Sequence, residues 1–338
     1  MKEIRDKARE RVKKRCRVCP VCDGRACAGE VPGMGGIGTG AAFQNNVRAL
    51  AALQVNMRVL HGANEPCACT EFFGLKLALP VMAAPVGSVA LNLGSDMSDT
   101  DYTRIMAAGC KAAGTLGSVG DMPDLGVMEQ HLKAFGDYVD YCIPFIKPWD
   151  VDAIKSRIDL IARFGCKIAG SDVDGAGLPT LRMLSAPVGT RPACDIAAVT
   201  SYAHEKGLKF IIKGVMTVDE AILCAEAGVD AIVVSNHGGR VLDCTPGTAD
   251  VLPEIADAVG GRMVVMMDGG LRSGLDVLKA MALGAKMTLI CRPVTIAVHG
   301  DENEGLAKYF AMIKDQFTQA MRMTGCPDVN SITRRVLY

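Results

Sequence analysis

The sequence predicts an α/β protein, a (β/α)8 TIM barrel preceded by a short cysteine-rich extension. Eight short apolar runs alternate with helix-length amphipathic stretches along most of the chain. These runs show little polar alternation, as expected for parallel strands that are covered on both faces. The 338 residues are also enough for one barrel of about 250 residues. A doubly wound sheet is the alternative, although about five or six strands are more usual for that fold.

The helices between the apolar runs carry boundary signals. Thr217 is a candidate N-cap, Glu220 is placed for a capping box, and Gly228 ends that helix. Ser273 opens a second helix of the same design. The eight strand candidates are, in chain order, Pro80–Ala84, Gly114–Gly117, Tyr138–Phe145, Lys167–Asp172, Leu208–Lys213, Ala231–Ser235, Met263–Asp268 and Met287–Cys291.

The composition excludes several classes of protein. The chain has 37 Lys and Arg residues against 37 Asp and Glu residues, so it lacks the excess positive charge that drives nucleic-acid binding. Its longest apolar stretch, residues 75–93, is interrupted by Lys76, Pro80 and Asn92 and predicts a strand and a loop, with no membrane span. The start, MKEIRDKARERVKKR, is charged and no apolar segment follows it, which argues against a signal peptide. We expect a cytoplasmic protein.

Polar residues follow most of the predicted strands. In a barrel of this kind the carboxyl ends of the strands meet at one rim, where catalytic groups lie. A single polar residue at the rim is readily explained as part of a solvated loop. A set drawn from several strands predicts a functional site. The residues in this set are Asp172, Asp174, Lys213, Ser235, Asn236, His237, Asp268, Arg272 and Arg292.

Two stretches at this rim predict catalytic groups. In IIKGVMT, Lys213 directly follows an apolar strand, where its amine could stabilise an anion, form a Schiff base or pair with an acid. In VSNHGGRVLD, His237 follows a buried strand, and the two glycines after it allow backbone to approach a ligand closely. Arg240 can bind a carboxylate through two parallel hydrogen bonds. A histidine beside such an arginine is suited to proton abstraction from an acid substrate.

A third stretch, MDGGLRSGLDVLKAMALGAKMTLICRP, predicts a phosphate site. Gly269, Gly270 and Gly274 lead into a helix after the seventh predicted strand, and Arg292 follows the eighth. The loops after these two strands are the usual phosphate site of such barrels, with backbone N–H groups and helix N-termini as donors. We therefore expect a ligand that carries a phosphate, such as a nucleotide or a flavin.

Together these motifs resemble the FMN-dependent α-hydroxy-acid oxidase and dehydrogenase family, which includes glycolate oxidase and lactate oxidase. The resemblance is carried by KG, SNHGGR-LD, DGG-R-G-DV-KA-ALGA and RP. It extends from about Asn45 to the C-terminus through NNVRALAAL, LPVMAAPVG and AMRMTGCPDVNSI.

The resemblance implies a role for each of these rim residues. Lys213 would lie near the N1–C2=O edge of the flavin and stabilise its reduced anion, while His237 would be the active-site base. Arg240 would hold the substrate carboxylate, and Asp174 matches the acid that pairs with the histidine. The phosphate would be bound by Gly270, Arg272 and Arg292. The full set of implied FMN contacts is Ala84, Val86, Ser118, Lys213, Ser235, Asp268, Gly270, Arg272, Cys291 and Arg292.

The sequence departs from the family where the substrate binds. The family has a tyrosine ahead of its first helix, but the corresponding PGMGGIGTG has none. A second tyrosine, in a Gln-x-Tyr after strand three, is replaced by Pro144-Phe145-Ile146. The nearest counterpart of the family's second substrate arginine is Arg182. The flavin half therefore matches better than the substrate half, and a simple glycolate or lactate oxidase is not expected.

Four of the 14 cysteines cluster in residues 1–40, which we separate as an extension from a barrel of residues 41–338. Their pattern, C-x2-C-x2-C-x4-C, resembles the ligation of a ferredoxin-type [4Fe-4S] cluster. Zn²⁺ held by four thiolates is the alternative, and uncoordinated thiols are the third. Cys67 and Cys69 could replace one ligand. The four clustered residues are Cys16, Cys19, Cys22 and Cys27.

The sequence thus predicts FMN-dependent oxidation of a 2-hydroxy acid, with a small carboxylate as substrate and an unknown electron acceptor. Hydride transfer and prior loss of the Cα proton both stay open. An iron–sulfur centre near the flavin would favour a dehydrogenase, and the family implies a homo-oligomer. One alternative is a flavin barrel with non-oxidative or reductive chemistry, similar to type 2 isopentenyl diphosphate isomerase. Another is a flavin or metal sensor or an electron-transfer subunit.

Overall fold

The computed structural model describes residues 1–12, 15–30 and 32–338, and its centre is a parallel sheet of eight strands. The strands are β3 (Val81–Ala83), β4 (Gly117–Gly120), β5 (Cys142–Ile146), β6 (Ile168–Asp172), β7 (Lys209–Val215), β8 (Ala231–Val234), β9 (Val264–Met267) and β10 (Met287–Ile290). Hydrogen-bonded neighbours follow the order β3-β10-β9-β8-β7-β6-β5-β4. The N–H of Ala83 donates to the carbonyl of Leu116 at 3.1 Å and so connects the two ends of this order. The predicted (β/α)8 barrel is confirmed.

Two predicted strands begin at the wrong residue. Gly114 has a φ of +65° and ends the preceding helix in the left-handed conformation, so β4 starts only at Gly117. The polypeptide Gly136–Tyr141 forms a 3-10 turn, and β5 therefore starts at Cys142 rather than at Tyr138. In both places an apolar run continues across a turn, and periodicity alone does not separate the turn from the strand.

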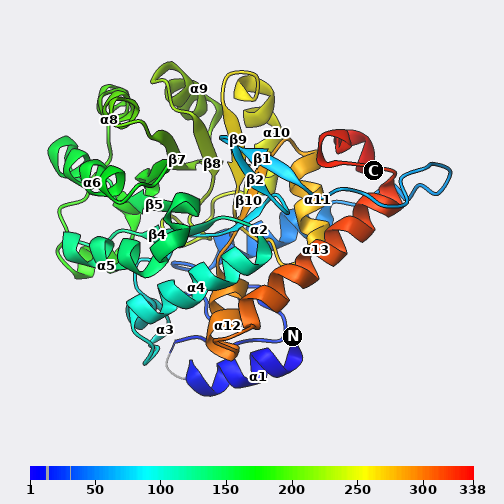
Figure 1. Cartoon of the computed structure of the whole chain (residues 1–338). Coiled ribbons are helices and arrows are strands. Elements are labelled where there is room, and N and C mark those ends of the chain that lie inside the picture. The colour runs from blue at the N-terminus through cyan, green and yellow to red at the C-terminus, as the bar shows by residue number, and fades with distance from the viewer. Residues whose placement is uncertain (13–14, 31) are drawn as a thin grey trace.

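Helices surround the strands (Figure 1). The capping box predicted at Ser273 is present, with Asp276 as its partner. Thr217 is the N-cap of its helix as predicted, but its side chain makes no cap hydrogen bond, so the predicted capping box with Glu220 is wrong. The helices are α2 (Ala41–Ala52), α3 (Val89–Leu93), α4 (Asp99–Ala113), α5 (Leu125–Phe135), α6 (Val151–Arg163), α7 (Pro179–Met183), α8 (Ala193–Glu205), α9 (Val218–Glu226), α10 (Thr248–Val259), α11 (Gly274–Ala282), α12 (Arg292–Gly300) and α13 (Gly305–Thr324).

An antiparallel hairpin that was not predicted precedes the barrel. Its strands are β1 (Thr70–Phe72) and β2 (Leu75–Leu77). Phe72 and Leu77 belong to the same buried cluster as the side chains inside the barrel. Several members of that cluster, including Ile168, Ala231 and Met287, lie at the first residues of their strands. The hairpin therefore covers the amino end of the barrel, opposite the rim where the predicted site lies.

The first helix, α1 (Lys2–Arg11), packs against α12 at the lower edge of Figure 1. A Cβ on Gly300 would lie 2.1 Å from the carbonyl oxygen of Ile4, so the two helices touch through backbone. Ala8 is fully buried in this contact. The guanidinium of Arg11 also donates to the carbonyl of His299 at 3.2 Å. This packing fixes α1, which precedes the cysteine segment in the chain.

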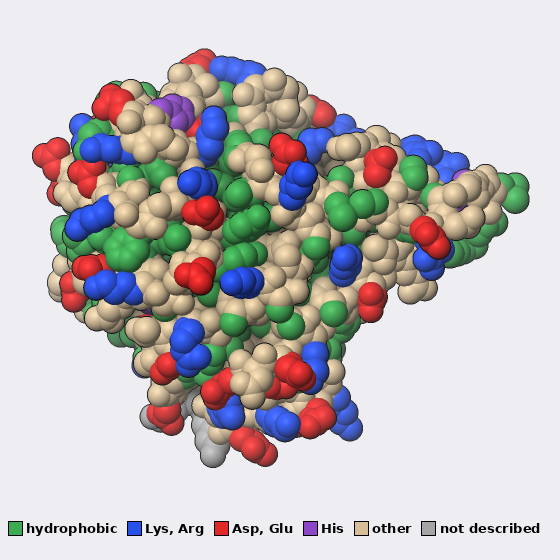
Figure 2. All heavy atoms as spheres, viewed as in Figure 1, with side chains coloured by type: hydrophobic (Ala, Val, Ile, Leu, Met, Phe, Trp, Pro, Cys, Tyr) green, Lys and Arg blue, Asp and Glu red, His purple; other side chains and the backbone are tan. Residues whose placement is uncertain are grey.

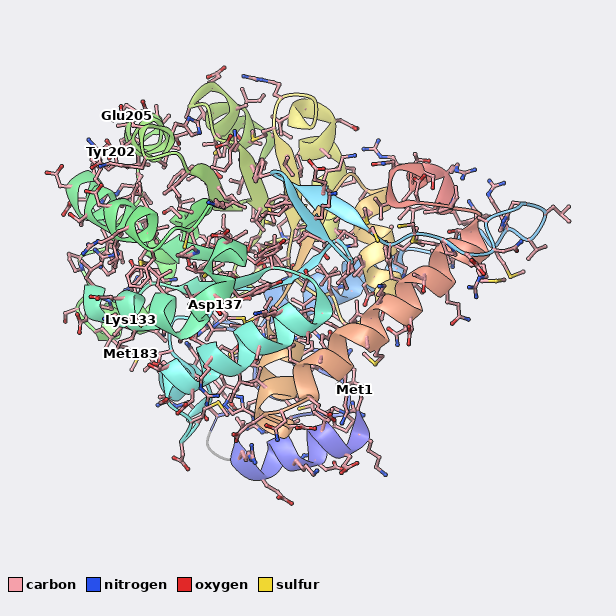
Figure 3. All side chains as sticks on the ribbon, viewed as in Figure 1. Met1, Lys133, Asp137, Met183, Tyr202 and Glu205 are labelled. Atoms are coloured by element: carbon pink, nitrogen blue, oxygen red, sulfur yellow. The ribbon has the colours of Figure 1, made fainter. Side chains whose placement is uncertain are left out.

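The outer surface carries charges of both signs. In the face shown in Figure 2, Lys and Arg side chains alternate with Asp and Glu side chains without a continuous field of one sign. Figure 3 shows Tyr202 and Glu205 on the outer side of α8, away from the strands. Among residues 1–12, 15–30 and 32–338, no helix has both the length and the hydropathy that crossing a bilayer requires.

Candidate active site

A pocket opens at the carboxyl ends of the barrel strands, and most of the residues predicted for the site line it. Of the residues predicted as catalytic groups or FMN contacts, three are not in its lining, and Asp172, Asn236 and Gly274 of the wider predicted set are also outside it. Asp174 contacts the pocket residue His237, Ser235 accepts a hydrogen bond from Lys213, and the Ser118 hydroxyl donates to the carbonyl of Ala83. The predicted residues in the lining are Ala84, Val86, Lys213, His237, Arg240, Asp268, Gly270, Arg272, Cys291 and Arg292.

His237 is held by a carboxylate and by an unusual backbone conformation. Its Nδ1 lies 2.9 Å from Oδ1 of Asp174, which follows β6. Its φ is +56°, a left-handed value that is uncommon outside glycine. The N–H of His237 donates to the Ser235 hydroxyl at 3.1 Å and stabilises this turn. These contacts hold the ring at the pocket with Nδ1 bonded to Asp174, and within the described residues Nε2 has no hydrogen bond and is available for other contacts.

Burial and charge keep this imidazole neutral. Burial is the largest cause of a pKa of His237 well below its usual 6.5, and the positive charges of Lys213 and Lys147 lower it further. Burial raises the pKa of Asp174, although the same two lysines oppose that shift. We take Asp174 as the acceptor from a neutral His237 because two ammonium groups face the carboxylate. A neutral histidine with a fixed tautomer can act as a base.

Lys213 is almost completely buried, with 2 % of its surface exposed. Its Nζ lies 3.4 Å from Asp268 and 3.9 Å from Asp174, and it donates to Ser235 at 3.0 Å. Burial opposes the charged form, but the nearby carboxylates outweigh it and raise the pKa of Lys213 above its usual value. The side chain is therefore an ammonium at neutral pH. It can stabilise an anion, but a Schiff base would require the neutral amine.

Arg240 is oriented by Asn92 on α3, whose Oδ1 accepts a hydrogen bond from its Nη2 at 2.6 Å. Burial is the main reason that the pKa of Arg240 falls to about 10, and the charge of Arg292 adds to it. Arg240 nevertheless remains a cation at neutral pH. Since Arg240 and His237 line the same pocket, they can contact one small carboxylate together.

The predicted phosphate residues lie beside the N-terminal segment. Arg292 packs over the ring of Phe43 at 3.7 Å and donates to the carbonyls of Met34 and Gly238. Arg272 donates to the carbonyl of Cys22 at 3.0 Å. Two guanidinium groups at one end of a pocket form a site for an anion.

Two glycines around the pocket are also required by the packing of helix α2, because a Cβ at either position would clash with the helix. A Cβ on Gly239 would lie 2.4 Å from the backbone nitrogen of Phe43, and one on Gly270 would lie 2.3 Å from the carbonyl oxygen of Asn46. Both contact residues belong to α2. The glycines predicted to admit a ligand therefore also admit α2, which packs directly against the site.

Lys147 and Asp172 form part of the site, and the sequence did not identify the lysine. Lys147 follows β5, lines the pocket and forms a buried ion pair with Asp172. It repeats the pattern of Lys213, a lysine after an apolar strand, which could have revealed it. Ligand atoms of Asp172, Asp174 and His237 lie within 4.8 Å of one another. Two lysines already neutralise these carboxylates, so the cluster is unsuited to a metal ion.

The candidate for the second substrate arginine and the candidate extra pair of cysteine ligands both lie outside the pocket. Arg182 is exposed on α7 and is not part of the pocket lining, so the second substrate arginine has no counterpart there. Cys67 and Cys69 are exposed, and Cys67 donates its N–H to the carbonyl of Pro327 near the C-terminus. They do not join the N-terminal cysteines. Ile146, which stands at the tyrosine position of the Gln-x-Tyr pattern, is fully buried in the core.

Comparisons with known proteins agree with this geometry. A family model described as FMN-dependent dehydrogenase matches residues 33–178 and 177–338. L-lactate oxidase of Lactobacillus jensenii is 30% identical over 322 residues, which cover 86% of this chain and 76% of that protein. A peroxisomal (S)-2-hydroxyacid oxidase of Arabidopsis thaliana is 46% identical over 127 residues, 38% of this chain and 35% of that protein. A solved structure of mandelate oxidase with a bound 2-hydroxy acid has a TM-score of 0.77 and 26% identity, covering 100% of this chain and 97% of the other.

Proposed function

Because the chain belongs to the FMN-dependent dehydrogenase family, we propose that it oxidises a 2-hydroxy acid to the 2-oxo acid, with FMN as the bound electron acceptor. The observation that carries this proposal is one pocket lined by His237, Arg240 and Lys213, with Arg272 and Arg292 in the same wall. A base, a cation for the carboxylate and a buried ammonium are the groups that this reaction needs.

The residues present fit FMN. Oδ1 of Asp268 is buried and has no hydrogen-bond partner within the described part of the chain, and such acceptors are usually satisfied. A ribityl hydroxyl of FMN would supply the missing donor, while Arg272 and Arg292 would bind the phosphate. Lys213 would face the N1–C2=O edge of the ring. When bound, FMN supplies a two-electron acceptor, which the side chains of the pocket lack.

The chain's own residues position the substrate and move one proton. Arg240 binds the substrate carboxylate through its guanidinium, which leaves the 2-hydroxyl group within reach of Nε2 of His237. His237 accepts the hydroxyl proton at Nε2. Asp174 holds Nδ1–H and stabilises the imidazolium that forms.

The relatives bear on the alternatives. They are named as oxidases of lactate, mandelate or other 2-hydroxy acids, and this does not favour an isomerase-like flavin barrel or a sensor. Several finer points remain proposals: an acceptor other than oxygen, a homo-oligomer, a cytoplasmic location, and an extension of residues 1–40 ahead of a barrel of residues 41–338. We also propose that the four N-terminal cysteines bind a metal group.

An anaerobic screen tests the proposed oxidation. The FMN-loaded protein is mixed with a panel of short and aromatic 2-hydroxy acids, and the flavin absorbance is followed. We expect at least one acid to bleach the flavin and to yield one 2-oxo acid per flavin. The matching 3-hydroxy acids serve as controls. If the protein binds FMN and no 2-hydroxy acid bleaches it, the proposed function is wrong.

The lowered pKa of His237 predicts how flavin reduction depends on pH. A base works only when it is deprotonated, so activity is lost as the pH falls through the pKa of His237 in the folded protein. Because that pKa lies well below 6.5, kcat/KM should stay constant from about pH 8 to below pH 6.5. Stopped-flow measurements across this range check the prediction. An acidic limb centred at or above 6.5 would contradict it.

The position of Lys147 in the pocket predicts that this residue contributes to substrate binding. Its ammonium lines the pocket, and the tyrosines and second arginine that the family resemblance implies for the substrate are missing from this chain, so we expect Lys147 to contact the substrate carboxylate. Lys147→Met should raise KM about 10- to 100-fold and change kcat much less. Steady-state kinetics with the best acid from the screen measure this. Lys133→Met, at an exposed lysine on α5 (Figure 3), is the matched control. A loss confined to kcat would rule out a binding role.

A further inference from the structure

The four N-terminal cysteines surround a cavity of their own. Its lining includes Phe43 and Arg292, which reach it from the barrel. None of the four forms a disulfide, and all are partly buried. The cysteines in the lining are Cys16, Cys19, Cys22 and Cys27. All four cysteines of the C-x2-C-x2-C-x4-C motif therefore line the same cavity.

The segment that carries these thiols has little structure of its own. Within the described residues, no helix or strand lies between Arg11 and Ala41. Arginine side chains hold its carbonyls instead: Arg9 binds Val18 at 2.8 Å and Arg5 binds Pro20 at 2.8 Å. A loop without a ladder of backbone bonds gains order when a metal group links its cysteines.

Val18, between the first two cysteines, has a strained backbone. Its φ is +46°, and its side chain is fully buried. A left-handed conformation is a genuine outlier for a β-branched residue and persists only where the surroundings impose it. The strained turn therefore lies inside the cysteine motif, between Cys16 and Cys19.

The spacing of the sulfur atoms favours a cluster over a single ion. Four thiolates on one Zn²⁺, each at 2.3 Å, stand about 3.8 Å apart. Within the described residues, the one group of three or more potential ligands within 4.8 Å of one another is Asp172, Asp174 and His237. No three of the cysteine sulfurs are therefore this close. A cube of four irons and four sulfides needs thiolates at its outer corners, which lie farther apart than the ligands of one ion.

The cavity adjoins the pocket of the candidate active site. Met34 and Arg292 line both spaces. Nη2 of Arg272 donates to the carbonyl of Cys22 at 3.0 Å and to its sulfur at 3.7 Å. The two arginines assigned to the FMN phosphate are thus also the groups that face the cysteine segment.

We propose that Cys16, Cys19, Cys22 and Cys27 ligate a [4Fe-4S] cluster, and that the bound cluster orders the wall of the FMN phosphate site. The first part stands independently of FMN. The second rests on the proposed function, because it takes Arg272 and Arg292 as phosphate ligands. A negatively charged cluster on one side and a phosphate on the other would both be neutralised by these arginines.

Metal and flavin contents, measured separately, test both parts. The full chain is purified anaerobically, reconstituted with Fe²⁺ and sulfide, and assayed for iron, acid-labile sulfide, zinc and FMN. We expect about four irons and four sulfides per chain, absorbance near 400 nm in the FMN-free protein, and an EPR signal after reduction. One zinc without sulfide, or no metal at all, would overturn the cluster.

Cysteine variants supply the second measurement. The double variant Cys19→Ser/Cys22→Ser should bind no cluster and bind FMN about tenfold more weakly in a flavin titration. Cys194→Ser, at an exposed cysteine on α8, should match the wild type. Unchanged FMN affinity in the double variant overturns the ordering role but leaves the cluster. A wild-type chain that holds the cluster and binds no FMN overturns the proposed function and, with it, the ordering role, but leaves the cluster.

Discussion

The variant His237→Asn is expected to reduce FMN about 10²- to 10⁴-fold more slowly than the wild type when mixed with substrate, the range that general-base catalysis typically contributes. The variant keeps Arg240 and Lys213, so it should still bind substrate and FMN. Asparagine is chosen because it tolerates the left-handed φ of +56° at this position better than most residues. Anaerobic stopped-flow measurement of flavin bleaching gives the rate, and the protein-bound flavin spectrum gives FMN occupancy.

His204→Asn is the matched control for this variant. His204 is an exposed histidine on α8 that pairs with Asp230 at 2.7 Å, on the outside of the barrel. Its replacement should leave the rate of flavin reduction unchanged. If His237→Asn reduced FMN at the wild-type rate while His204→Asn did the same, His237 would not be the base and the proposed proton transfer would fail.

The variant Gly270→Ala should lose both stability and FMN. Gly270 has a φ of +81°, and a Cβ there would lie 2.3 Å from the carbonyl oxygen of Asn46 on α2. The strained conformation and the forced movement of α2 each cost about 1 to 3 kcal/mol. We expect the Tm to fall by about 5 °C or more and the FMN content to drop, because Gly270 lines the pocket. Thermal unfolding and flavin content measure the two effects.

Gly261→Ala is the control for backbone entropy and for the added methyl group. Gly261 is exposed, and a Cβ there would meet nothing within 4 Å. This variant should unfold at or slightly above the wild-type Tm. If Gly270→Ala were as stable as Gly261→Ala, α2 would be able to move without loss of stability, and the close contact between Gly270 and α2 would not be required.

The sequence predicted the barrel because buried parallel strands have a strong and simple pattern. It missed the hairpin because each of its strands has three residues, too few for a period of two to show. It also placed the starts of β4 and β5 too early, since apolar residues continue through the turns before them. Short elements and turns inside apolar runs depend on tertiary contacts that a one-dimensional pattern does not contain.

The sequence predicted some residues of the candidate site and missed others for a similar reason. Lys213, His237 and Arg240 stand beside glycines and strand ends, so local sequence identifies them. Lys147 also follows an apolar strand, but no glycine motif marks it, and its importance comes from its ion pair with Asp172 on the neighbouring strand β6. The dual use of Gly270, for the pocket and for α2, likewise depends on which helix packs there. Contacts between distant segments decide these roles.

The hairpin of β1 and β2 has a consequence for turnover. Because Phe72 and Leu77 fill the amino end of the barrel, small molecules have no path along the barrel axis through the described residues. The 2-hydroxy acid substrate and the 2-oxo acid product must therefore enter and leave through the same opening, the pocket at the carboxyl ends of the strands. Product must therefore leave before the next substrate can enter.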